Sequence, residues 1–174
     1  MGSRYLQGRF AHATFYTRSN RSDGGQSMAT FLASEIAEKI QAPGENPVRV
    51  LNRVRNWMKM GLLRPVGDAH PGSGRASEYS EDTLLDAALL QKFTMAGIAA
   101  VDAAAALKEA KEQLEEKTKR TRDWMLVIHR PRDQYTWSVG MVEPSGLGGF
   151  IKRHFPNETC VVVYVKALLE QLGL

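Results

Sequence analysis

The chain of 174 residues has one cysteine, Cys160, and four histidines scattered along its length. A single cysteine excludes an internal disulfide framework and any site that needs two thiolates from one chain. His154 and Cys160 together offer two metal ligands, fewer than the four of a structural zinc site. No nucleophile lies in a recognisable catalytic pattern. We therefore expect no catalytic residues, no metal and no cofactor, and we do not expect an enzyme.

Long apolar runs are also absent. No run approaches the roughly 18 residues that a membrane-spanning helix needs. The composition, 43% hydrophobic and 24% charged, is typical of a globular chain. These absences predict no membrane partner, and the lone cysteine fits a reducing cytoplasm.

Acidic residues are scarce in one segment. Residues 48–75 carry six arginines and lysines but one acid, Asp68, although the net charge of the whole chain is only +4. Residues 76–116 reverse the sign. A basic block beside an acidic one is more typical of a surface that binds phosphates than of charges that only keep a protein soluble.

Residues 1–27 lack a sustained hydrophobic period and are rich in arginine, serine and glycine. We interpret them as a disordered leader or a mis-called start, with Met28 as the first residue. An organelle transit peptide is the less favoured alternative, since it shares this acid-poor composition.

Capping signals predict two helices joined by a turn. Ser34 can cap a short helix over residues 35–41, which Pro43-Gly44 ends. Asn46-Pro47 then supplies a cap followed by proline at the first helical position. The second helix is expected to run to Met60, before Gly61. This order predicts a helix-turn-helix pair.

The two faces of the second helix differ sharply. At 100° per residue its core stripe consists of Val50, Leu51, Val54, Trp57 and Met58. The opposite face and its flanks carry Arg49, Asn52, Arg53, Arg55, Asn56 and Lys59, with no acid. Arginine can bond guanine and asparagine can bond adenine in the major groove. The alternative is a merely solvated basic face.

Two further helices are expected. Ser80 can cap a third helix that ends at Gly97, with Leu84, Leu85, Ala88, Leu89 and Phe93 facing inward. Residues 99–122 then favour a long helix. Its seam of small and apolar residues has heptad spacing: Ala100, Ala103, Leu107, Ala110 and Leu114. This seam predicts a dimer contact, and the alternative is a helix packed on its own C-terminal unit.

The stretch "NRVRNWMKMGLLRP", followed by "GSGRASEYSEDTL" and "LLQKFTMAGI", resembles the MerR family of regulators. The match covers about 70 residues. The resemblance implies a winged helix-turn-helix, with Trp57 near the DNA backbone, Arg75 in the wing and Tyr79 closing the wing onto the core. This chain departs from the pattern in its longer turn "APGENP", in Asn56 where the family has an aromatic residue, and in one extra wing residue.

The resemblance implies a DNA-binding transcriptional regulator that acts as a homodimer on promoter DNA in the bacterial cytoplasm, associated with the nucleoid. The expected DNA-binding residues are Arg49, Asn52, Arg53, Arg55, Asn56, Trp57, Lys59 and Arg75. The expected dimerisation residues are Ala103, Leu107, Ala110 and Leu114. A contact with RNA polymerase and a small-molecule effector, whose identity is unknown, are left open. The alternatives are a phage-type architectural DNA-binding protein (an excisionase or packaging adaptor) and a protein-interaction module.

The C-terminal third is rich in β-branched and aromatic residues. The segments "WMLVIHR", "YTWSVGMVE" and "TCVVVYV" predict a small antiparallel sheet closed by a helix over 166–172. The expected fold is mainly α with a small β part. We divide it into a DNA-binding domain (28–97), a dimerisation helix (98–122) and a β-rich unit (123–174), and we expect the first to fold without the others.

Overall fold

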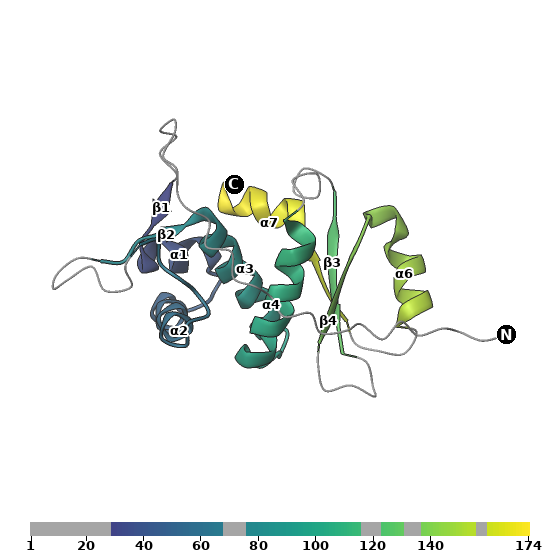
Figure 1. The fold of residues 1–174 in the computed structure, drawn as a ribbon, viewed down its shortest axis with the longest axis horizontal. Helices are drawn as coiled ribbons and strands as arrows, with labels where there is room; N and C mark the ends of the chain where they lie inside the picture. The colour runs from purple at the N-terminus through teal and green to yellow at the C-terminus, as the bar shows by residue number, and fades with distance from the viewer. Residues whose placement is uncertain (1–28, 68–75, 116–122, 131–136, 156–159) are drawn as a thin grey trace, which may run out of the picture.

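The computed structural model describes residues 29–67, 76–115, 123–130, 137–155 and 160–174. The fold is α+β, mainly helical with a small antiparallel sheet, as the sequence predicts (Figure 1). Among the described residues, no helix combines the length and the apolar character needed to cross a membrane. Residues 1–28, which include the predicted leader, lie outside the described part.

The first two helices are α1 (Ala33–Ile40) and α2 (Pro47–Lys59). α2 begins as predicted, because the side chain of Asn46 accepts hydrogen bonds from the N–H groups of the first turn and Pro47 follows it. α1 is capped differently from the prediction. It starts after Leu32, whose N–H donates to the carboxylate of Glu35 at 2.6 Å, so Ser34 is not the cap.

A short antiparallel pair precedes the third helix. β1 (Thr30–Phe31) pairs with β2 (Tyr79–Ser80), so the chain that enters α1 lies beside the chain that enters α3. α3 (Glu81–Met95) begins after Ser80, whose hydroxyl accepts from the Thr83 N–H, as predicted. Gly97 follows its end with a φ of 85°, a backbone conformation that glycine adopts without steric cost.

The predicted C-terminal sheet is present. β3 (Met125–His129) lies between β4 (Ser138–Val142) and β5 (Cys160–Tyr164), and both pairings are antiparallel. α4 (Ala100–Leu114) packs between α3 and this sheet, with Gln113 donating to the Val139 carbonyl at 2.8 Å. The rest of the long helix predicted over 99–122 falls mostly outside the described residues.

Two short helices complete the described part of the structure. α6 (Leu147–His154) follows the 3₁₀ turn η1 (Pro144–Gly146) and covers the face of the sheet opposite α4 (Figure 1). The sequence pattern does not predict α6, because Gly148 and Gly149 lower helix propensity. α7 (Val165–Leu172) is the predicted closing helix, and it packs back on α1 and α3.

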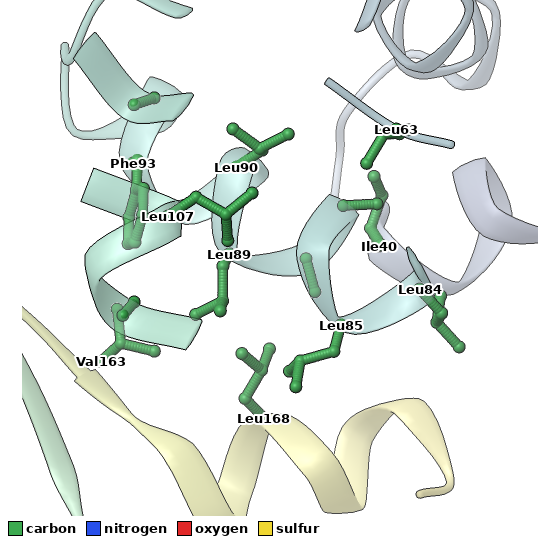
Figure 2. Close-up of a cluster of buried hydrophobic side chains, with 14 of the residues drawn as sticks. Ile40, Leu63, Leu84, Leu85, Leu89, Leu90, Phe93, Leu107, Val163 and Leu168 are labelled. Carbon is green, nitrogen blue, oxygen red and sulfur yellow. The ribbon is translucent and has the colours of Figure 1, made fainter. Parts of the chain in front are cut away.

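A single hydrophobic core joins the N-terminal helices to the C-terminal sheet. Figure 2 shows Leu168 of α7 directed at Leu85 and Leu89 of α3, with Val163 of β5 nearby. A chain that ended at Gly97 would expose these leucines of α3, and the independent folding of residues 28–97 stays a prediction. The boundary at Gly97 is a break in helical structure and not a break in packing.

The predicted dimer seam is buried inside the single chain. Ala103, Leu107, Ala110 and Leu114 are all buried, facing α3 and the sheet. The arrangement is therefore the alternative one, a helix packed on its own C-terminal unit. The physical reason is that small side chains let helices approach closely, whether the neighbour belongs to the same chain or to another. The homodimer itself stays a prediction without an assigned surface.

The first prediction concerns α7. Leu168→Ala should lower the free energy of unfolding by about 2–5 kcal/mol, because it leaves a cavity against α3. Leu174→Ala is the control, since Leu174 is exposed, and it should stay within about 0.5 kcal/mol of the parent protein. Urea unfolding followed by circular dichroism measures both. If Leu168→Ala unfolded in two separate transitions, the single-core description would be wrong.

The second prediction tests where the α4 seam points. Ala110→Leu should destabilise the fold by about 1–3 kcal/mol, because the added atoms have no space in a packed interior. The control Ala105→Leu, on the exposed face of the same helix, should be nearly neutral. Thermal unfolding gives the stability, and sedimentation gives the mass. A stable Ala110→Leu protein of doubled mass would restore the seam as a dimer contact.

Candidate nucleic-acid interface

The exposed face of α2 is basic and polar. Its exposed polar and charged residues are Arg49, Asn52, Arg55, Asn56 and Lys59. No acid occurs anywhere in α2. The structure therefore gathers five of the predicted DNA-binding residues on one accessible surface, which we call the α2 face.

The α2 face is presented by a firmly held helix. On its inner side Val50, Val54 and Trp57 are buried in the core. At its start, the Asn46 Oδ1 accepts from the N–H groups of Val48 at 2.9 Å and Arg49 at 3.3 Å. These bonds occupy two donors that a helix otherwise leaves unpaired. The first turn of α2 is thereby fixed in place.

Arg53 has a structural environment that differs from the α2 face. Its guanidinium donates to Glu45 Oε1 at 2.6 Å and also to Gln91 Oε1. Gln91, which is 2% exposed, donates in turn to Glu45 Oε2 at 2.8 Å. These three residues, the Glu45–Arg53–Gln91 network, connect the α1–α2 turn, α2 and α3. Arg53 was predicted to contact DNA, but its described contacts hold α2 in position.

The network also lowers the pKa of Glu45 below its ordinary value of 4.5. Desolvation is the largest single effect and by itself would raise that pKa. The hydrogen bonds from Arg53, the Ala42 N–H and Gln91, together with the charge of Arg53, outweigh it. Because the folded protein prefers the charged carboxylate, this group stabilises the fold above its unfolded pKa. The stabilisation is lost as the pH falls through the lower, folded pKa.

Two predicted DNA-binding residues lie elsewhere. Trp57 is 2% exposed, so its side chain belongs to the core and does not reach the surface. The reason is its position on the core stripe, beside Val50 when α2 is viewed end on. Arg75 lies outside the described residues.

The base of the predicted wing is described, although its tip is not. The Val66 N–H donates to the Glu78 carbonyl at 2.8 Å, which brings the two ends of the intervening loop together. The Thr83 hydroxyl donates to the Arg64 carbonyl at 3.1 Å and joins this base to α3. Tyr79, to which the resemblance assigns the closing of the wing, is buried.

Three residues of this region were missed by sequence reasoning. The sequence does contain a signal for Glu45 and Gln91. A glutamine among the apolar residues of a helix needs a polar partner, and that need indicates a residue such as Glu45. Val48 was also missed. It lies off the core stripe of α2 and is 65% exposed, on the same side of the helix as Asn52 and Arg55.

Comparison of the chain with protein-family models found no match, and comparison with curated proteins found none either. The resemblance to the MerR family therefore depends on the quoted residues and their spacing alone.

The third prediction concerns the Glu45–Arg53–Gln91 network. Glu45→Gln should lower the free energy of unfolding by about 1–3 kcal/mol near neutral pH, since it weakens a partly buried charged hydrogen bond. As the pH falls through the lowered pKa of Glu45, the difference from the parent protein should shrink, because protonation removes the same charge from the parent. Glu143→Gln, at an exposed position, is the control. A stability difference that stayed constant from neutral to acid pH would contradict the role of the carboxylate charge.

Proposed function

We propose that this protein is a sequence-specific DNA-binding regulator of transcription, built as a winged helix-turn-helix of the MerR type. The observation that supports it is the α2 face, an accessible surface of two amides and three cations on a helix with no acid. In this proposal α2 enters the major groove of duplex DNA, where the first turn of a recognition helix meets base edges.

The side chains of the α2 face suit both the recognition of bases and the contact with phosphates. Arg49 and Asn52 lie near the start of α2, where an arginine can bond guanine and an asparagine can bond adenine. Arg55 and Lys59 lie further along, where long cations can contact phosphate oxygens. Because α2 is capped at its start and buried on its inner side, the backbone that carries these groups would lose little conformational freedom on binding.

The charge balance favours this function over a merely solvated face. Among the described residues, none of Arg49, Arg55 and Lys59 forms an ion pair, whereas Arg53 is paired with Glu45. Glu45 thus pairs with Arg53, the arginine that positions α2. The charges of Arg49, Arg55 and Lys59 are not neutralised by a described acid. Unpaired cations on one surface attract a polyanion and release its counterions on binding.

The remaining features of the proposal come from the resemblance. The loop that contains Arg75 would act as a wing on flanking phosphates, because its base is closed beside the α2 and α3 junction. Two copies would present their α2 helices to a pseudo-palindromic promoter site in the bacterial nucleoid. That homodimer would use a surface other than the α4 seam, which is occupied within the chain.

The fourth prediction distinguishes residues that recognise bases from residues that contact phosphates. Arg49→Ala and Asn52→Ala should each cost about 1–3 kcal/mol on a duplex selected from a random-sequence pool, and little on scrambled duplex. Lys59→Ala should weaken both duplexes alike and lower the slope of log affinity against log salt by about 0.9. The measurement is a fluorescence-anisotropy titration of each duplex at several salt concentrations.

The matched control is Arg153→Ala. Arg153 is an exposed cation of α6, and α6 and α2 lie at opposite ends of the molecule (Figure 1). Arg153→Ala removes one positive charge, as Arg49→Ala and Lys59→Ala do, and it should bind DNA as the parent protein does. If all four variants lost affinity equally, binding would reflect net charge alone. If the parent bound no duplex with measurable salt dependence, the proposed function would be wrong.

A further inference from the structure

One apolar side chain interrupts the α2 face. Val48 is 65% exposed, and its neighbours on this side of the helix are Arg49, Asn52 and Arg55. Val48 packs little against the core, and a β-branched residue has a lower helix propensity than alanine or lysine. Folding therefore gives no reason for a valine at this position.

Exposure by itself does not distinguish Val48 from other surface residues. Val101 is 70% exposed and is likewise the second residue of its helix, α4. The difference lies in the surroundings. Val48 stands in the first turn of the helix with the acid-free basic face, where a recognition helix approaches base edges.

The position of the Val48 methyl groups is also well defined. Asn46 bonds the Val48 N–H at 2.9 Å, and Pro47 precedes it with a restricted backbone angle. A valine in a helix strongly prefers one side-chain rotamer. Beside it lies a hollow of about 310 Å³ between α1 and α2, bordered by Ala37, Pro47 and Leu51 among others. A small apolar group could therefore contact Val48 without displacing the chain.

We propose that Val48 reads the C5 methyl group of a thymine in the major groove. This inference rests on the proposed DNA binding and adds a specificity-determining contact to it. Thymine is the base that presents a methyl group in that groove, and apolar side chains recognise it by contact. Arg49 and Asn52 read hydrogen-bonding atoms, whereas Val48 supplies a contact in the first turn of α2 that depends on an apolar group.

The test removes the methyl group from the DNA and the valine from the protein. The probe is a duplex that the full chain selects from a random-sequence pool, with each thymine replaced in turn by uracil. Uracil keeps the base-pairing atoms and lacks only the methyl group. At one position, uracil should weaken binding of the parent protein about three- to fivefold, the effect of losing one buried methyl contact.

Val48→Ala, which lacks both γ-methyl groups, should show a smaller preference for the thymine duplex over the uracil duplex at that position. Val101→Ala is the matched control, and it should keep the parent's preference for thymine. Circular dichroism confirms that both variants fold. If no uracil substitution weakens the parent, if the selected site contains no thymine, or if Val48→Ala retains the full preference, the inference is overturned while DNA binding stands. If the pool yields no bound duplex, the proposed function fails as well.

Discussion

The third helix has almost no polar face, and the rest of the structure depends on covering it. Between Thr83 and Phe93 only Asp86 and Lys92 escape full burial. A helix that is apolar on nearly every side must be surrounded by other elements. α1, α4 and α7 supply that cover, and α1 and α7 come from segments far apart in the sequence. For this reason the N-terminal helices and the C-terminal sheet share one core.

The one polar side chain fully buried near the end of α3, Gln91, links this core to the candidate interface. It bonds Glu45 and Arg53 together, so the position of α2 relative to α3 depends on hydrogen bonds with a fixed geometry. Apolar contacts alone would leave α2 freer to slide, because the hydrophobic effect is not directional. The network therefore connects the packing of the core to the orientation of the α2 face.

The distribution of charge on α2 then acquires a simple interpretation. Its arginines fall into two groups, which differ in how far they are buried. Arg53 is partly buried and neutralised by Glu45, whereas Arg49 and Arg55 are exposed and carry uncompensated charge. A basic face built in this way can attract a polyanion without weakening the fold, since the cation nearest the core already has its partner.

The sequence by itself determined the features that depend on near neighbours. Asn46-Pro47, Ser80 and Gly97 mark helix ends, because caps act over three or four residues. The β-branched segments 125–129 and 160–164 likewise form the predicted strands. Only the tertiary structure decided which partner each surface met. The α4 seam packs within the chain, Arg53 meets Gln91 from a helix 38 residues away, and α7 closes over α3. These outcomes depend on which distant segments come together, and the same apolar or charged pattern is compatible with several partners until the whole chain has folded.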